Sequence, residues 1–435
     1  MKHSSTSALL SGLVVLLPLL QACTDVCEST TTYTVYEPVF TMAADLKTSI
    51  GYEAPRDLHE PGKIYRYGDY LLVNELHEGL HIFDNKDPQR PVNLKFLAIP
   101  GNVDMALRDG ILYADNYVDL VAIDLTDPLA ARVTERIPNV FAHNYNWAGT
   151  DSTLFISDWQ ETEQVKLSDC QEAPWNNGQG WREGDGIIVL FGGFANTKAY
   201  SSSGAAPQVG VAGSMARFAQ YDRYLYTVGP SDMRLYDVST PTTPVPGPVL
   251  NVGFGVETIF AYKDMLYLGS SFGMYIYDNS DPRQPVQLGQ YPHVLSCDPV
   301  VVQDDYAYVT LRSGSLCGVG AWTDQLMVID VRKPSNPTLL KTYPMTNPHG
   351  LSIDGCNLFI CEGTDGLKTF KTTDPEQLEL VQHLTGMDAY DVIAYDDLLI
   401  MIGKDGLYQY TYTDFCQQTA ALQPLSVIPV KRPAS

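Results

Sequence analysis

A proline-marked turn recurs about every 41 residues along this chain. Its occurrences are Asp87-Pro88, Asp127-Pro128, Thr240-Pro241, Asp281-Pro282, Lys333-Pro334 and Asp374-Pro375. An internal repeat of this length constrains the fold more than any single motif does, because one such unit buries its faces only against its neighbours. The repeat therefore predicts an array of similar units rather than a set of unrelated domains.

Each repeat unit predicts four short β-strands. In one unit the strand-like runs are residues 103–107, 111–115, 120–124 and 133–137. These runs are rich in Val, Ile, Leu and Tyr and are too short for helices. Asp-Gly tips suit tight hairpins, and Asp-Pro presets one φ while the Asp side chain caps the turn. Glycines that precede the third strand suggest a positive φ there; they are Gly79, Gly273, Gly366 and Gly406.

The spacing of the marks predicts eight units between about residues 62 and 430. The gap between Pro128 and Pro241 is long enough to hold one further unit with an insertion, and another unit follows Pro375. Eight four-stranded units indicate an all-β fold, a β-propeller. Seven blades is the alternative, which applies if the hidden unit with runs at 143–147, 154–157 and 187–191 is not a blade. The run 32–40 is predicted to add a strand that completes the last blade.

The third strand and its turn resemble the LVIVD-repeat family of bacterial proteins. The matching runs are Leu326-Met327-Val328-Ile329-Asp330, Leu120-Val121-Ala122-Ile123-Asp124 and Leu80-His81-Ile82-Phe83-Asp84. The resemblance covers nearly all of residues 62–415 and departs at 187–192 and 366–372, where the Asp is missing. It implies a secreted or surface-attached propeller and leaves the activity open.

The amino end of the chain predicts export and lipid attachment. Lys2 precedes an apolar stretch at 8–20, which is too short to span a bilayer as a helix. Leu20-Gln21-Ala22-Cys23 resembles a bacterial lipoprotein processing site, in which Cys23 becomes the lipidated first residue. An ordinary secreted protein cut near Ala22 is the alternative. Thr24 after the cysteine favours the Gram-negative outer membrane, with the chain facing the periplasm or the cell surface.

These features divide the chain into four parts. Residues 1–22 are the signal peptide, 23–61 an anchor linker with an amino-terminal strand, 62–430 the propeller, and 431–435 a tail.

The charge balance excludes some partner classes. The chain has 28 basic and 51 acidic residues and a net charge of −23. Nucleic acid binding needs clustered Lys and Arg, so this composition argues against it. It also argues against a polybasic membrane surface, so membrane contact is expected only through the lipid anchor.

Eight cysteines in an exported chain suggest an oxidising compartment. With Cys23 lipidated, seven remain, so at least one is free or pairs elsewhere. Cys27 and Cys416 lie near the two ends of the folded region, and Cys297 and Cys317 lie in neighbouring loops of one unit. Cys27–Cys416 and Cys297–Cys317 are therefore the candidate disulfides.

Tryptophans gather in loops that are predicted to share one face of the propeller. Trp159, Trp175 and Trp181 lie in an insertion at 158–185, and Trp322 lies in a second long loop. Variable loops on a rigid scaffold carry function, and Trp is enriched in binding hot spots. The alternative is that these rings pack the loops onto the propeller.

Charged residues at the starts of the first strands are expected to converge on the mouth of the central channel. They are Asp104, His143, Glu257, Asp298, His349 and Asp391. Carboxylates and imidazoles in this arrangement could hold a divalent cation. The alternative is a solvated, hydrogen-bonded channel lining. No other cofactor is predicted.

Two matches to enzyme motifs fall on repeat scaffolding. His77-Glu78-Gly79-Leu80-His81 matches a zinc protease pattern that needs both histidines on one helix, whereas here the second is predicted in a strand. Gly269-Ser270-Ser271-Phe272-Gly273 matches a nucleophile elbow, but no helix is predicted after it. Neither match indicates the corresponding chemistry.

The sequence thus predicts a lipid-anchored envelope propeller that acts as a non-enzymatic scaffold for a protein or glycan partner. The alternative is an envelope hydrolase or lyase that uses the acidic, histidine-containing channel mouth.

Overall fold

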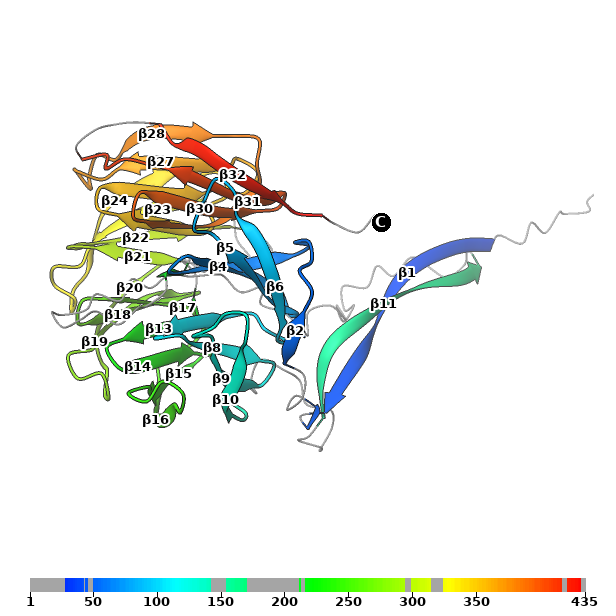
Figure 1. Cartoon of the computed structure of the whole chain (residues 1–435). Coiled ribbons are helices and arrows are strands. Elements are labelled where there is room, and N and C mark those ends of the chain that lie inside the picture. The colour runs from blue at the N-terminus through cyan, green and yellow to red at the C-terminus, as the bar shows by residue number, and fades with distance from the viewer. Residues whose placement is uncertain are drawn as a thin grey trace, which may run out of the picture. The chain divides into compact units, whose positions relative to one another are not determined.

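The computed structural model describes residues 28–42, 44–45, 50–141, 154–169, 211–212, 216–293, 299–313, 324–416 and 421–431. The elements in these ranges are the strands β1 to β32 (Figure 1). Within the same ranges, no helix has the length and apolarity needed to cross a membrane.

Among the described residues, six four-stranded antiparallel sheets and the four central strands of a six-stranded sheet form the seven blades of a β-propeller. Blade 1 is β3 (Pro61–Tyr67), β4 (Tyr70–Glu75), β5 (Gly79–Asp84) and β6 (Val92–Ala98); blade 2 is β7 (Met105–Arg108), β8 (Ile111–Asn116), β9 (Asp119–Asp124) and β10 (Arg132–Ile137). Blade 3 is β13 (Phe218–Tyr221), β14 (Tyr224–Val228), β15 (Asp232–Asp237) and β16 (Val245–Asn251); blade 4 is β17 (Val256–Tyr262), β18 (Met265–Ser270), β19 (Gly273–Asp278) and β20 (Val286–Pro292). Blade 5 is β21 (Val300–Gln303), β22 (Tyr306–Leu311), β23 (Gln325–Asp330) and β24 (Thr338–Pro344). Blade 6 is β25 (Leu351–Asp354), β26 (Asn357–Cys361), β27 (Leu367–Lys371) and β28 (Glu379–Leu384); blade 7 is β29 (Ala389–Tyr395), β30 (Leu398–Gly403), β31 (Gly406–Thr411) and β32 (Gln423–Pro429).

The blade count corrects the expectation of eight and agrees with the alternative of seven. Blades 2 and 3 pack directly on each other, because Tyr113 and Phe141 share one buried apolar cluster with Phe218. The hydroxyl of Tyr113 also donates to the carbonyl of Pro241 at 2.8 Å. A further blade has no place between them.

The segment expected to hold the hidden blade contributes a different element. Residues 154–157 begin the long strand β11 (Leu154–Asp169), which pairs with β1 (Glu28–Met42) in a two-stranded sheet. The runs 143–147 and 187–191 lie outside the described residues.

The two-stranded sheet also corrects the expected role of residues 32–40. They lie in β1 and pair with β11, so they do not complete the last blade. At one end of the sheet, the Thr41 hydroxyl donates to the Ser157 hydroxyl at 2.7 Å. Most of this sheet falls in a compact unit separate from the propeller.

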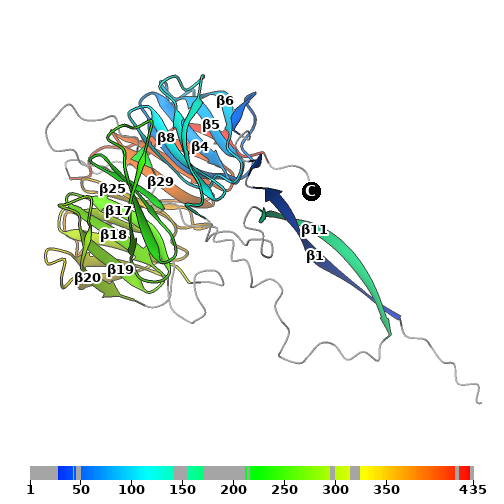
Figure 2. The same cartoon turned by 90° about the horizontal axis from the view of Figure 1, so that it is seen from below.

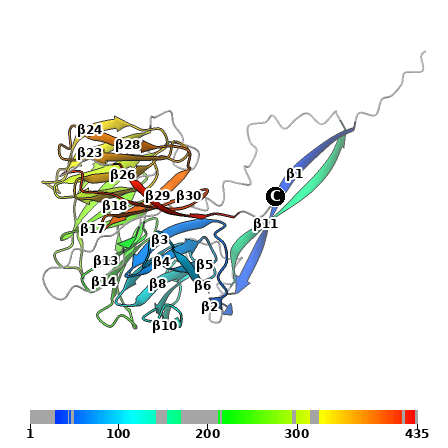
Figure 3. The same ribbon diagram turned by 45° about the horizontal axis from the view of Figure 1, so that its top comes forward.

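The ring closes where blade 7 meets blade 1 (Figures 2 and 3). Ile64 and Phe83 of blade 1 share a buried cluster with Ile400 of blade 7. Leu58 forms a parallel bridge with Val430. Two short strands extend blade 1: β2 (Gly51–Glu53) pairs with β6, and β12 (Val211–Ala212) pairs with β3. Packing and this bridge therefore close the ring together with hydrogen bonds, such as that from Asn85 Nδ2 of blade 1 to Gln409 Oε1 of blade 7 at 2.8 Å.

One face of the propeller, here called the turn face, carries short and uniform connections. The first and second strands of each blade are joined by two residues, at 68–69, 109–110, 222–223, 263–264, 304–305, 355–356 and 396–397. The third and fourth strands are joined by seven residues in six blades, at 85–91, 125–131, 238–244, 279–285, 331–337 and 372–378. Aspartates cap these turns as predicted, since Asp127 Oδ1 accepts from the Leu129 amide at 2.9 Å.

The opposite face, here called the loop face, carries connections of very different length. Some are as short as the two residues 117–118, whereas the chain between β10 and β13 spans residues 138–217.

Glycine before the third strand is required by close packing of the outer strand. Gly79, Gly273 and Gly366 have φ values of 142°, 153° and 93°, which confirms the predicted positive φ, whereas Gly406 lies outside the positive-φ set. A Cβ on Gly273 would lie 2.5 Å from the carbonyl oxygen of Tyr291 in the outer strand. Other side chains are therefore excluded at Gly273.

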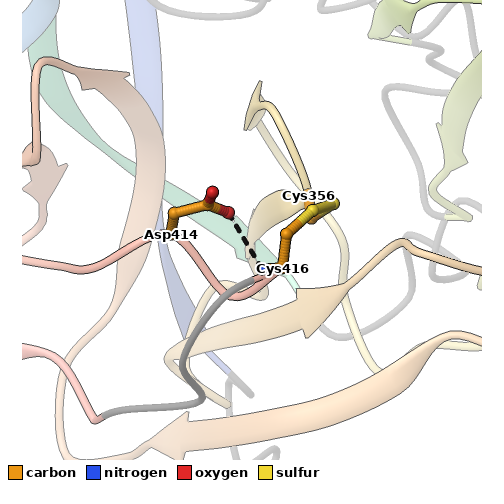
Figure 4. A group of neighbouring side chains, drawn as sticks. All are labelled: Cys356, Asp414 and Cys416. Carbon is orange, nitrogen blue, oxygen red and sulfur yellow. Dashed lines mark hydrogen bonds between the residues drawn. A yellow bond between two sulfur atoms is a disulfide. The ribbon is translucent and has the colours of Figure 1, made fainter.

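Cys416 forms a disulfide with Cys356, which corrects the expected Cys27–Cys416 pair (Figure 4). The Cα atoms are 5.5 Å apart, because Cys356 lies in the turn after β25 and Cys416 lies in the neighbouring turn after β31. Both turns are on the turn face of adjacent blades. Cys361 is a buried free thiol, and Cys23, Cys27, Cys297 and Cys317 lie outside the described residues.

Candidate functional site

The channel mouth is formed where the innermost strands begin, on the loop face. Asp104 directly precedes β7, Glu257 lies in β17, His349 precedes β25, and Asp391 lies in β29. These four predicted residues therefore lie at the starts of the innermost strands of blades 2, 4, 6 and 7, as expected. His143 and Asp298 lie outside the described residues.

Asp104 is held by a buried ion pair. Its Oδ2 contacts the ammonium of Lys63, and the two side chains are only 2% and 3% exposed. The same oxygen accepts from the Arg217 amide at 2.6 Å, and Oδ1 accepts from the Met105 amide at 2.7 Å. Burial lowers the pKa of Lys63, while the nearby Asp104 opposes that shift. The partners of Asp104 thus tie blades 1, 2 and 3 together.

Asp115, at the end of β8, is a buried acid that the sequence reasoning did not single out. Its Oδ1 accepts from Asn102 Nδ2 at 2.7 Å and from the amides of Val103 and Asp104 at 2.8 and 2.9 Å. Burial raises the pKa of Asp115 to about 7, although these amide bonds act in the opposite direction. The sequence signal that could have identified Asp115 was an aspartate at the end of an otherwise apolar strand.

Glu257 is bonded to a serine of the rejected nucleophile-elbow match. Ser271 lies in the two-residue connection between β18 and β19, and its hydroxyl donates to Glu257 Oε1 at 2.8 Å. Burial raises the pKa of Glu257, and the positive charges of Arg217 and Arg312 oppose the rise. Strand β19 follows the segment directly, so the segment is a turn between two strands.

His349 is paired with Arg312, a second residue that the sequence reasoning missed. Arg312 Nη1 lies 2.8 Å from His349 Nδ1 and 3.0 Å from Nε2. Burial and the guanidinium together lower the pKa of His349 to about 3, so the imidazole is neutral near pH 7. The ring of Tyr390 lies 5.4 Å from the imidazole. The signal for Arg312 was its place at the start of a long connection.

Asp391 is fully buried beside the backbone of blade 6. A Cβ on Gly350 would clash with its carboxylate, and the Gly350 amide donates to the Tyr390 carbonyl at 2.9 Å. Asp104 and Glu257 are therefore held by separate partners, Lys63 and Ser271.

The channel-mouth cation remains a prediction. Among the described residues, the group of three that could hold a metal is Cys356, Asp414 and Cys416, which lie in turns on the turn face and not at the mouth (Figure 4). Its two cysteines are joined as a disulfide, so their sulfurs are not thiolate ligands. His143 and Asp298, which would complete a site at the mouth, lie outside the described residues.

The loop face exposes an aromatic pair that the sequence reasoning did not select. Phe254 precedes β17 and is 68% exposed, and Phe272 precedes β19 and is 48% exposed. Their ring centroids are 6.1 Å apart. Among the predicted tryptophans, Trp159 lies in β11, and Trp175, Trp181 and Trp322 lie outside the described residues.

The His77-to-His81 motif is scaffolding, as predicted. His77 lies in the connection after β4 with a φ of 63°, whereas His81 is buried in β5. His81 Nε2 lies 2.9 Å from Glu75 Oε2. Burial acts to raise the pKa of Glu75, but the bonds from His81 and from two backbone amides hold it below its usual range.

Comparisons with known proteins yield structural neighbours at low sequence identity. No family model and no curated protein sequence matches this chain. A protein from Lactobacillus plantarum is 13% identical with a TM-score of 0.48, covering 85% of this chain and 97% of that chain. Hsv2 from Kluyveromyces lactis is 10% identical with a TM-score of 0.46, covering 84% and 98%. BamB from Moraxella catarrhalis is 10% identical with a TM-score of 0.45, covering 86% and 99%.

Proposed function

We propose that the chain is a lipid-anchored interaction scaffold of the bacterial envelope. Its loop face would bind a protein or glycan partner. The proposed anchor is Cys23 in the Leu20-to-Cys23 sequence, with the outer membrane as the expected location. Lipid attached to this cysteine would hold the protein at the membrane through its buried methylenes.

The difference between the two faces carries this proposal. Seven two-residue turns and six seven-residue turns make the turn face nearly uniform, whereas connections on the loop face range from two residues to the whole span 138–217. A rigid scaffold that varies on one face only is typical of proteins that bind through that face. The loop face also exposes Phe254 and Phe272.

Affinity capture from envelope extracts tests the proposal. The full chain, solubilised in detergent, serves as bait beside a variant in which residues 314–323 are replaced by a Gly-Ser linker and Trp175 and Trp181 are changed to Ala. We expect a partner that the full chain retains and the variant loses. A turn-face control, Arg283→Gln with Asp281→Asn, should retain the partner because both residues are exposed on the opposite face. Equal capture by all three proteins would contradict the proposal.

A further inference from the structure

We propose that the loop face beside blade 4 binds an acidic sugar, with Arg217 as the group that recognises the carboxylate and Phe254 and Phe272 as the surface for the ring. This inference rests on the proposed function, because it names the chemical class of a ligand for the same face. The argument combines an unpartnered cation, a set of mixed hydrogen-bonding groups, and an exposed aromatic pair.

Arg217 is a cation at the channel mouth whose side chain has no partner within the described part of the chain. Its backbone amide donates to Asp104, but within the described ranges its guanidinium forms no hydrogen bond or ion pair. The residue is half-buried at the start of the innermost strand of blade 3. Lys63, in contrast, is neutralised by Asp104. A planar guanidinium with free donors is matched by a carboxylate, which it can bind through two parallel hydrogen bonds.

Glu257 with Ser271, and Arg312 with His349, offer both donors and acceptors on the loop face. The Glu257 carboxyl accepts from the Ser271 hydroxyl, and its ionisation is influenced by the charges of Arg217 and Arg312. On the other side of blade 5, the neutral imidazole of His349 lies against Arg312. Sugar hydroxyls both donate and accept, so they need such a mixture rather than a patch of one charge.

Phe254 and Phe272 place apolar surface next to these groups. Phe272 directly follows Ser271, and Phe254 lies three residues before Glu257. A Cβ on the intervening Gly255 would lie 3.0 Å from the Ser271 hydroxyl oxygen and 3.5 Å from the Phe272 ring, so the two loops are in contact. Exposed aromatic rings beside polar groups suit a ligand with one apolar and one polar side.

An acidic sugar uses all three features at once. Its ring packs on the phenylalanines, its hydroxyls meet Glu257, Ser271 and His349, and its carboxylate meets Arg217. An acidic peptide would use the guanidinium, but its carboxylate side chains carry no ring to pack on the two phenylalanines. A neutral sugar would leave the guanidinium without an anion. The observations therefore favour the acidic sugar.

Calorimetric titration of the full chain in detergent tests the inference. The probes are trigalacturonate, the neutral galactotriose of the same linkage, and triglutamate. We expect trigalacturonate to bind at least about tenfold more tightly than either of the others, which is the change that one charged hydrogen-bonded contact gives.

Substitutions test whether Arg217 makes the contact with the sugar carboxylate. Arg217→Gln should weaken trigalacturonate binding at least about tenfold, and Arg217→Lys should fall between the two because it keeps the charge but loses the planar fork. Phe254→Ala should weaken binding about three- to tenfold. Arg283→Gln, on the turn face, should leave binding unchanged. Thermal melting of each variant separates loss of binding from loss of folding.

The failing outcomes are distinct. Equal binding of the two saccharides, no binding of trigalacturonate, unchanged binding by Arg217→Gln in a folded protein, or preference for triglutamate would each overturn the inference. If partner capture still depends on the loop face in that case, the proposed scaffold function stands without the acidic sugar. If capture does not depend on the loop face, the proposed function falls regardless of the titrations.

Discussion

Capping aspartates on the turn face and two buried acids on the loop face have opposite pKa shifts. On the turn face, hydrogen bonds from the residue two positions later lower the pKa of each capping aspartate; these are Asp124, Asp237, Asp278 and Asp330. On the loop face, burial raises the pKa of Asp115 to about 7 and also raises that of Glu257. The carboxylate charge is therefore stabilised in these turns and destabilised at Asp115 and Glu257.

This difference in pKa shift distinguishes the aspartates that stabilise the turns from the acids that are candidates for ligand binding. Turn-face aspartates stay in water and satisfy backbone amides, which costs little and stabilises the turn. Loop-face charges have been taken out of water, which costs free energy unless each is paired. Groups kept in such an environment are candidates for ligand recognition. Four substitutions, two on each face, test whether the residues of the two faces contribute differently to stability.

The largest effect is expected from Lys63→Met on the loop face. It leaves the Asp104 carboxylate buried beside blades 1 to 3 without its cation. Breaking a buried pair from one side typically costs about 3–5 kcal/mol. Urea denaturation should show a loss of this size in the free energy of unfolding.

Two controls accompany Lys63→Met. The double change with Asp104→Asn should recover much of the loss, because the uncompensated charge is then removed. Arg283→Gln breaks an exposed pair with Asp281 on the turn face and should leave the unfolding midpoint unchanged. A Lys63→Met protein as stable as the wild type would show that loop-face burial carries no such cost.

The next effect is expected on the turn face, from Cys356→Ser. The disulfide to Cys416 closes a loop across a sequence separation of 60 residues and joins blades 6 and 7. Its loss should reduce the free energy of unfolding by about 2–4 kcal/mol, because the unfolded chain gains conformational freedom. Denaturation without reductant measures the change.

Cys416→Ser serves as the matched variant for the disulfide. It should give the same loss, and the two changes together should give no more than either one, because one bond is removed in every case. Wild type treated with reductant should match the variants. Additive losses would mean that the cysteines act through their separate packing.

A smaller effect, visible as pH dependence, is expected from Asp115→Asn. The pKa of Asp115 is about 7 in the folded chain and about 3.9 when unfolded, so the folded state binds more protons between these values. Its contribution to stability therefore falls as pH rises through that window and is constant above it. Between pH 5.5 and 7 the wild type should lose about 1–2 kcal/mol from this group, and Asp115→Asn should not.

Comparing the wild type with Asp115→Asn at each pH isolates the contribution of Asp115 to the free energy of unfolding. His349 has the opposite sign, since its folded pKa of about 3 lies below the unfolded value and stability rises with pH up to about 6.5. Both proteins keep His349, so its contribution cancels in the difference. Parallel stability curves for the two proteins would contradict a raised pKa at Asp115.

The repeat made the propeller predictable, because local strand and turn signals recur in every blade. The Asp-Pro caps and the glycines at 79, 273 and 366 are local features, so the sequence alone revealed them. The number of blades was overestimated, because the long gap after Pro128 matches a repeat in length, while β11 pairs with the distant β1. Which strand pairs with which over that distance depends on tertiary packing.

The site was predictable in position but not in its partners. Repeat alignment placed Asp104, Glu257, His349 and Asp391 at the starts of the innermost strands. Lys63, Asp115 and Arg312 were missed, because their importance depends on burial and on neighbours from other blades. The Cys356–Cys416 bond was missed for the same reason, since it joins turns of different blades.

The smallest effect is expected from Asp237→Ala on the turn face, and it tests whether the capping aspartates are as replaceable as the comparison requires. Asp237 Oδ1 accepts from the Ser239 amide at 2.8 Å, and Ser239 is exposed, so water can replace the lost acceptor. The free energy of unfolding should fall by only about 0.5–1 kcal/mol. Asp278→Ala should give the same loss, because Asp278 accepts from the Ser280 amide at the same distance in the next blade. Losses that approach that of Lys63→Met would mean that the turns, and not the buried charges, control the stability of the ring.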